Sequence, residues 1–160
     1  MAPRRTIAVI GANDASAAVA ELAYATGKAI AGHGAVLICG GGGGVMSEAA
    51  RGSRSAGGVT IGVLPGYDRS AANPHIEYVL ATGMGQARNA IIVASADAVV
   101  ALAGEGGTLS EIGLALKLGR PVVALRAWEQ LEMISHATDA AAAVEMALRL
   151  AEHIPVRSVR

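Results

Sequence analysis

The sequence predicts an open, doubly wound α/β fold, in which a parallel sheet carries helices on both faces. Short runs rich in Val, Ile and Leu alternate with Ala-rich segments of helical spacing along the 160 residues. Two glycine-rich turns, "GGGGG" at 40–44 and "GEGG" at 104–107, each follow such a run and precede a helical segment. The length fits one domain, 1–160, and we expect frayed ends at 1–5 and 155–160.

The first part of the chain alternates between strand and helix. "TIAVIG" at 6–11 is a β-branched run that ends in a turn, so it predicts the first strand. Residues 16–34 are Ala-rich, with apolar residues at helical spacing and a final glycine that suits a C-cap. "AVLIC" at 35–39 predicts a buried second strand, and the glycines after it lead into a helix over 45–56. "VTIGVLP" at 59–65 predicts a third strand.

The middle of the chain begins with a loop. "GYDRSAANP" at 66–74 is full of turn formers, and such a loop either connects two strands or folds over a ligand as a lid. "IEYVL" at 76–80 predicts a fourth strand, and residues 85–95 predict a helix. "AVVALA" at 98–103 is a continuous apolar run of the kind found inside parallel sheets.

The last elements complete the alternation. "GEGGTLSEIGLALKLG" at 104–119 predicts a turn, a helix and a C-cap, and "PVVAL" at 121–125 predicts the last strand. Residues 138–153 predict a final amphipathic helix. In open sheets of this kind, ligands bind beyond the carboxyl ends of the strands, where the strand order reverses. Both glycine turns follow strands, so we expect both at that edge.

The glycine turns themselves point to an anion. Neither matches the dinucleotide fingerprint or the P-loop, so classical NAD and ATP sites are disfavoured. What remains is a helix N-terminus with free N–H groups and a positive dipole end, which suits a phosphate and occurs twice. Tight packing between strand and helix is the alternative reason for so many glycines. The glycines expected to bind the ligand are Gly41, Gly42, Gly43, Gly44, Gly106 and Gly107.

Polar side chains accompany these turns. Thr108-x-x-Glu111 has the spacing of a capping box. On spacing alone, this structural role is slightly favoured over a role in phosphate binding and catalysis. Arg88 and Asn89 stand early in a predicted helix, where a cation opposes the dipole, and Asn89 is expected to bind the ligand. The place of Arg88 therefore indicates that a phosphate or carboxylate lies nearby, rather than that the side chain is merely solvated. Asn13 and Asp14 follow the first strand and suit contact with a ribose, a turn or a helix N-cap.

Composition narrows the function classes. Thirteen Lys and Arg balance thirteen Asp and Glu, and Arg4 and Arg5 form the only basic pair, which argues against nucleic acid as the main partner. The longest mainly apolar stretch, 90–103, is shorter than a membrane span. The four histidines are scattered, so no metal site is expected. Cys39 is the one cysteine, which indicates a buried thiol in a reducing, cytoplasmic compartment.

Three motifs in this order resemble those of the LOG-like family, which is often mislabelled lysine decarboxylase: "GGGGGVM" at 40–46, "MGQARN" at 84–89 and "GEGGTLSE" at 104–111. The family includes cytokinin riboside 5'-monophosphate phosphoribohydrolases and a molybdenum-cofactor carrier protein, and this chain most resembles the short subgroup that holds the carrier. The likeness implies a Rossmann-like fold and a small phosphorylated ligand, either an AMP-like nucleotide or the molybdenum cofactor, with no cofactor required. It also implies a homo-oligomer, a dimer or tetramer.

The hydrolase pattern P-G-G-x-G-T-x-E-E, with an upstream Arg after a Met, falls here on Arg88, Thr108 and Glu111. By this resemblance Glu111 assists an oxocarbenium-like transition state at C1', and Arg88 clamps the phosphate or orients Glu111. The chain departs from the pattern at Ala103, Glu105, Ser110 and Asn89, where the hydrolases have Pro, Gly, Glu and Lys. These departures weigh against turnover and leave the phosphate turn in place.

Three functions follow from the sequence, in this order. The first is hydrolysis of the N-glycosidic bond of a nucleoside 5'-monophosphate to free base and ribose 5-phosphate. The second is a non-catalytic carrier or sensor of the molybdenum cofactor or another phosphorylated ligand. The third, a DNA-interacting scaffold, lacks a basic face. A decarboxylase that uses pyridoxal phosphate is excluded because both lysines, Lys28 and Lys117, lie in predicted helices away from the expected site.

Overall fold

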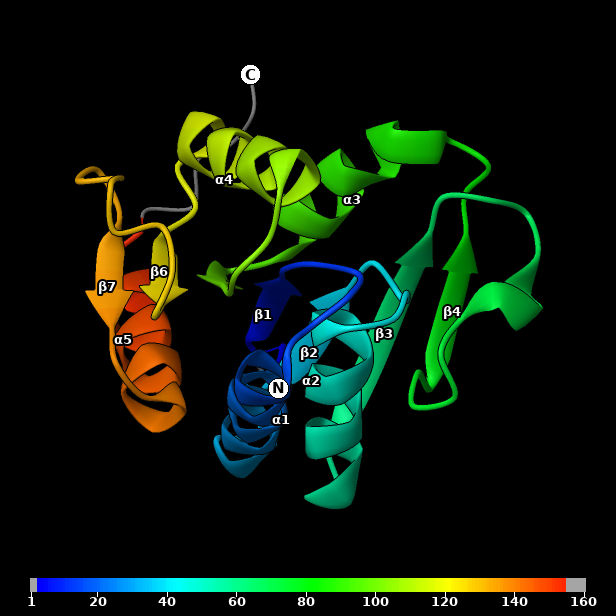
Figure 1. Cartoon of the computed structure of the whole chain (residues 1–160), viewed down its shortest axis with the longest axis horizontal. Helices are drawn as coiled ribbons and strands as arrows, with labels where there is room; N and C mark the ends of the chain where they lie inside the picture. Colours follow the sequence, from blue (N-terminus) through cyan, green and yellow to red (C-terminus); the bar gives the residue numbers. More distant parts are fainter. Residues whose placement is uncertain (1–2, 155–160) are drawn as a thin grey trace.

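The computed structural model describes residues 3–154, which form a parallel sheet in the order β4-β3-β2-β1-β5-β6-β7 (Figure 1). Every neighbouring pair of strands is parallel, which confirms the predicted fold class. Of the ends expected to be frayed, residues 1–2 and 155–160 lie outside the described residues. The strands are β1 (Thr6–Ile10), β2 (Val36–Cys39), β3 (Val59–Leu64), β4 (Tyr78–Ala81), β5 (Ala98–Ala101), β6 (Val122–Leu125) and β7 (Ser135–Ala137).

Helices cover both faces of the sheet. The α-helices are α1 (Ala17–Gly32), α2 (Val45–Ser55), α3 (Arg88–Ser95), α4 (Gly106–Leu118) and α5 (Ala140–Glu152), and the short 3-10 helices are η1 (Arg69–Ala71) and η2 (Gly85–Ala87). In Figure 1, α1, α2 and α5 lie on one side of the strands, and α3 and α4 lie on the other. Within residues 3–154, no helix is long and apolar enough to span a membrane.

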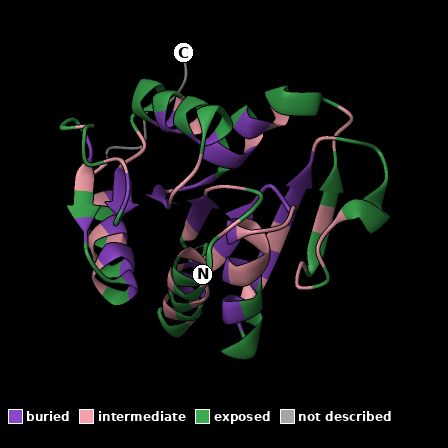
Figure 2. Cartoon of the chain, viewed as in Figure 1, coloured by how far each residue is buried: buried purple, intermediate pink, exposed green. Residues whose placement is uncertain are grey.

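Two hydrophobic cores follow from the alternation of side chains along the strands. In β1, Ile7 and Val9 belong to the core beneath α1, α2 and α5, whereas Ala8 and Ile10 belong to the core beneath α3 and α4. β1, β5 and β6 are buried almost throughout, and the edge strand β4 is largely exposed (Figure 2). The continuous apolar runs of the sequence are thus the central strands of a sheet covered on both faces.

Helices α1 and α2 touch through their backbones. A Cβ atom added at Gly27 would lie 1.8 Å from the carbonyl oxygen of Ala49, and one added at Gly52 would lie 1.9 Å from that of Tyr24. Both distances are far shorter than any real contact between these atoms, so this crossing requires glycine at both positions.

Some predicted boundaries shift for local reasons. The helix predicted over 85–95 starts as the 3-10 helix η2 and becomes α-helical at Arg88. The last helix starts at Ala140, because Asp139 caps it by accepting a hydrogen bond from the backbone N–H of Ala142 at 2.8 Å. Strand β7 is absent from the sequence prediction, since its three residues, Ser135–Ala137, show no apolar run.

The strand order reverses at β1, which lies between β2 and β5. After β1 the chain builds β2, β3 and β4 in one direction, then returns to build β5, β6 and β7 in the other. After β1 the chain turns to α1 on one face of the sheet, and after β5 it turns to α4 on the other, which leaves a crevice beyond the strand ends as in other doubly wound sheets.

Candidate functional site

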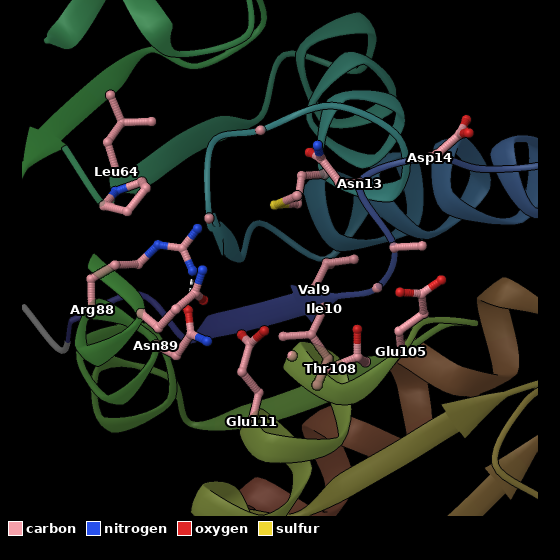
Figure 3. A pocket seen from close by; sticks show the side chains of 18 of the residues that line it. Val9, Ile10, Asn13, Asp14, Leu64, Arg88, Asn89, Glu105, Thr108 and Glu111 are labelled. Carbon is pink, nitrogen blue, oxygen red and sulfur yellow. Dashed lines mark hydrogen bonds between the residues drawn. The ribbon is translucent and has the colours of Figure 1, made fainter. Parts of the chain in front are cut away.

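A cavity of about 590 Å³ occupies this crevice (Figure 3). Both glycine turns contribute to it, the first through Gly40 and Gly42 and the second through Gly107, so both lie at one edge of the sheet as predicted. The predicted site residues that line the cavity are Asn13, Gly42, Arg88, Asn89, Gly107, Thr108 and Glu111. The predicted residues Gly41, Gly43, Gly44 and Gly106 are not part of this lining.

The first glycine turn is shaped mainly by contacts within the protein. A Cβ atom at Gly40 would lie 2.8 Å from the Arg88 guanidinium, and one at Gly42 would lie 2.7 Å from the side-chain oxygen of Asn13. Gly44 has a φ of +56° and its Cα faces the carbonyl oxygen of Ala12, where an added Cβ would be 2.4 Å away. Contact with backbone atoms therefore requires glycine at position 44, whereas the atoms near Gly40 and Gly42 are the ends of side chains that can move.

Two amides of the first turn are occupied by contacts within the protein. The N–H of Gly43 donates to Asn13 Oδ1 at 2.9 Å, and the N–H of Gly41 donates to Cys39 Sγ at 3.4 Å. These two N–H groups are engaged inside the protein and do not point at a ligand. Asn13, expected to contact a ribose or form a turn, uses its side-chain oxygen to hold the glycine turn.

The second glycine turn has the open geometry that an anion needs. Glu105 is the N-cap of α4, and the first helical hydrogen bond runs from Leu109 N–H to the Glu105 carbonyl at 2.9 Å. The N–H groups of Gly106, Gly107 and Thr108 thus precede Leu109, whose N–H is the first to donate within the helix. No atom lies within 4 Å of a Cβ added at Gly106 or Gly107. Open space and free N–H groups at a positive dipole end favour a phosphate.

The capping-box interpretation of Thr108 and Glu111 is wrong. Thr108 is the third residue of α4, not its N-cap, and no side chain caps this helix. The T-x-x-E spacing lies inside the helix, because the helix already begins at Gly106. Thr108 is only 4% exposed and lines the cavity, with its hydroxyl against the Cα of Gly104. Its position beside the free N–H groups suits the functional alternative.

Arg88 and Glu111 reach the same cavity from different helices. Figure 3 shows Arg88 and Asn89 of α3 beside Glu111 of α4, across from the first glycine turn. Arg88 is half-buried; burial lowers its pKa, and Glu111 opposes that shift. Within residues 3–154, no ion pair of 4.0 Å or less joins Arg88 to Glu111. The two charges therefore interact electrostatically without direct contact, and a ligand or water can lie between them.

Glu111 has an unusual acidity for a carboxyl group. Burial raises its pKa from the ordinary value of 4.5 to about 7, and Arg88 limits the rise. A carboxyl group with this pKa is present in both protonation states near neutral pH, which is the range a general base needs. Strongly perturbed titratable groups in a cleft mark candidate functional residues.

The shifted pKa of Glu111 leads to a stability prediction. In the folded protein Glu111 stays protonated up to about pH 7, whereas in the unfolded chain it loses its proton near pH 4.5. The protonated carboxyl group therefore contributes to the free energy of unfolding at low pH, and this contribution is lost as pH rises from 4.5 to 7. Glutamine has no such titration. The free energy of unfolding of Glu111→Gln, relative to that of wild type, is therefore expected to be higher at pH 8 than at pH 4.5, by on the order of 2 kcal/mol. Urea unfolding at both pH values measures this difference. An equal difference at both pH values would contradict it, and Glu145→Gln, an exposed acid on α5, is the control.

The apolar end of the cavity was not predicted as part of the site. It is lined by Met46, Leu64, Pro65 and Ala71, with Gln86 as the neutral polar neighbour. The loop at 66–74 is tied to the first glycine turn, since Asn73 donates from its backbone to the Gly41 carbonyl at 2.9 Å and from its side chain to the Gly42 carbonyl at 2.8 Å. The turn formers in the sequence of this loop indicated that it could lie over a ligand. They could not show which of its residues face the cavity, because that depends on these tertiary contacts.

The cavity also has acidic side chains, of which Asp14 was expected near a ribose and Glu105 was not expected in the site. Asp14 and Glu105 line the cavity, and Glu105 is the N-cap of α4. Among residues 3–154, no group of three His, Cys, Asp or Glu side chains is arranged to hold a metal ion. The polar groups of the cavity are therefore one cation, several carboxyl and carboxamide groups, and the free N–H groups of α4.

Comparisons with known proteins find a matching family model and several similar chains. The family model of the SLOG cluster4 family matches residues 4–154. A cytokinin riboside 5'-monophosphate phosphoribohydrolase of Mycobacterium tuberculosis is 36% identical over 111 residues, which cover 67% of this chain and 59% of that protein. This chain therefore spans about three fifths of that relative's length.

Two solved structures are similar over nearly the whole chain. The molybdenum cofactor binding protein from Rippkaea orientalis has a TM-score of 0.88 and 33% identity, over 94% of this chain and 99% of that one. The molybdenum cofactor carrier protein from Chlamydomonas reinhardtii has a TM-score of 0.85 and 34% identity, over 92% of this chain and 98% of that one.

Proposed function

Because this chain belongs to the SLOG cluster4 family, a LOG-like family, we propose that its cavity binds a nucleoside 5'-monophosphate and hydrolyses the N-glycosidic bond. The products are the free base and ribose 5-phosphate. The observation that carries this proposal is that Arg88 and a Glu111 with a pKa of about 7 face one cavity, beside an unoccupied set of helix N–H groups. The similarity to the phosphoribohydrolase of Mycobacterium tuberculosis supports it.

The 5'-phosphate binds at the N-terminus of α4. Gly106 and Gly107 supply backbone N–H groups of the first turn of α4, and Thr108 supplies a hydroxyl. The apolar end, formed by Met46 and Leu64 among others, then receives the base. This orientation places the ribose between the two ends, beside Glu111, which lies one helical turn beyond Thr108.

Glu111 assists the chemistry at C1'. As the C1'–N bond breaks, its electron pair leaves with the base, which takes a proton from solvent, and positive charge develops on the ribose. The Glu111 carboxylate stabilises this charge and accepts a proton from the water that adds to C1'. Arg88 holds the ribose side of the cavity and keeps enough Glu111 ionised near neutral pH, because it opposes the effect of burial.

The experiment that tests this function is an assay of adenine release from AMP. We expect wild-type protein to release adenine and ribose 5-phosphate in equal amounts. Adenosine, which lacks the phosphate, is expected to react far more slowly at the same concentration, because the α4 N–H groups would have no partner. Absence of adenine release from AMP and from the other common nucleoside 5'-monophosphates would contradict the proposal.

A second candidate function is a non-catalytic carrier of the molybdenum cofactor or another phosphorylated ligand. The observation that favours it is the similarity to two molybdenum cofactor proteins over almost the whole chain. Glu105 and Ser110, where the hydrolases have Gly and Glu, favour it as well. Native mass spectrometry of freshly purified protein separates the two functions, since a carrier is expected to retain a molybdenum-containing ligand without releasing any base.

A further inference from the structure

We infer that Asn89 is a positioning residue: its carboxamide holds the Arg88 guanidinium over the cavity and, being uncharged, leaves Glu111 facing a single cation within residues 3–154. This inference rests on the function proposed above for Arg88 and Glu111. It changes the role expected for Asn89 from contact with the ligand to control of the charged pair.

Asn89 is placed to do this by the start of α3. It is the second residue of the helix, only 4% exposed, and it lines the cavity. A buried carboxamide needs hydrogen-bond partners, and its Oδ1 accepts a hydrogen bond from Nη1 of Arg88. Adjacent residues on a helix normally point in different directions, so this bond turns both side chains toward one space.

Arg88 depends on that bond for its orientation. Its Nε is buried without a hydrogen-bond partner among the described residues. The guanidinium lies against the Cα of Gly40, where an added Cβ would be 2.8 Å from Nη2, and no ion pair fixes it to Glu111. Asn89 is thus the side chain that the structure shows holding the guanidinium.

The charges around Glu111 show why neutrality at position 89 matters. Arg88 approaches from α3 and Cys39 from β2. Burial raises the pKa of Cys39 to about 11, so this thiol stays uncharged near neutral pH. Asp14 and Glu105 line the opposite end of the cavity. A charge introduced at position 89 would therefore act on Glu111 together with Arg88 alone.

Two substitutions separate the two roles. Asn89→Asp keeps the shape and the acceptor for Arg88 but adds a negative charge. We expect it to move the titration of Glu111, followed by carboxyl carbon NMR, up by about 1 pH unit, and to move the acid limb of kcat equally. Asn89→Leu keeps the size but removes the acceptor. We expect it to lower kcat for AMP by about 10- to 100-fold, with a much smaller change in KM.

The expected pattern is specific to a positioning role. The plateau kcat of Asn89→Asp at high pH is expected to approach that of wild type, whereas Asn89→Leu remains slow at every pH. Circular dichroism and thermal unfolding check that both variants fold. If Asn89→Asp leaves the Glu111 titration unmoved, or Asn89→Leu keeps full kcat, the inference is overturned.

The NMR titration also keeps this inference separate from the proposed function, because it needs no turnover. If wild type releases no base while Asn89→Asp still shifts Glu111, the hydrolase function fails and control of the charged pair stands. If AMP is cleaved and both variants behave as wild type, the function stands and the role of Asn89 fails.

Discussion

Glu111→Gln is expected to lower kcat for adenine release from AMP by about 10²- to 10⁴-fold, the range typical for loss of a general base. The substitution keeps the size of the side chain but removes the charge and the proton acceptor. KM is expected to change little, because the phosphate binds at the N-terminus of α4, one turn away. In wild type, kcat is expected to fall as pH drops below about 7, since only the ionised carboxylate is active.

Initial rates of adenine release, measured from pH 5 to pH 9, check this prediction. Glu145→Gln removes an exposed acid from α5, on the other face of the sheet, and is expected to retain wild-type rates. A Glu111→Gln variant with wild-type kcat would remove Glu111 from the chemistry. A wild-type kcat that does not change between pH 6 and pH 8 would lead to the same conclusion.

Gly27→Ala is expected to destabilise the fold by about 3 kcal/mol or more, although alanine normally favours a helix. The added methyl group would overlap the Ala49 carbonyl oxygen, at 1.8 Å, and crowd its carbon, at 2.7 Å. Both atoms belong to the backbone of α2, so the strain is relieved only if the two helices move apart. Moving α2 also moves the first glycine turn, which leads directly into it.

Urea unfolding at fixed pH measures this loss, and Gly113→Ala is the matched control. Gly113 lies in the middle of α4, and nothing lies within 4 Å of a Cβ added there. The control is expected to raise the free energy of unfolding by about 0.5–1 kcal/mol, because alanine loses less backbone freedom on folding. Equal effects of the two substitutions would show that the α1–α2 contact tolerates a side chain.

The fold could be predicted from the sequence because each central strand is a short apolar run followed by a helical segment. That pattern is local and survives without tertiary information. Strand β7 could not be found this way, since Ser135–Ala137 becomes a strand only by pairing with β6. Its neighbour β6, by contrast, is apolar throughout.

The site was only partly accessible from sequence. Arg88, Thr108 and Glu111 come together because each lies just after the carboxyl end of a strand or at the start of the next helix, which motif order and fold class suffice to predict. The capping-box interpretation failed because the same spacing also occurs one turn inside a helix that begins with glycines. Whether a glycine faces a ligand or a neighbouring chain segment depends on contacts such as that of Gly43 with Asn13.

The five glycines at 40–44 and the pair Gly106 and Gly107 therefore have different physical origins. In the first turn, Gly44 meets backbone atoms of Ala12 and Asn13, and the side-chain ends of Asn13, Met46 and Arg88 lie close to Gly40 and Gly42. The second turn faces open space and keeps its N–H groups free for a ligand. A glycine-rich sequence alone does not separate these two cases.

The central claim is that the 5'-phosphate of a nucleotide binds the N-terminus of α4, with its C1' held beside Glu111. The crystal structure of the Glu111→Gln variant with AMP tests it most directly, because that variant is expected to bind AMP without cleaving it. We expect the phosphate within hydrogen-bond distance of the Gly106 and Gly107 N–H groups, and C1' between Arg88 and position 111. A phosphate bound by Arg88 instead, or a nucleotide bound outside the cavity, would contradict the claim.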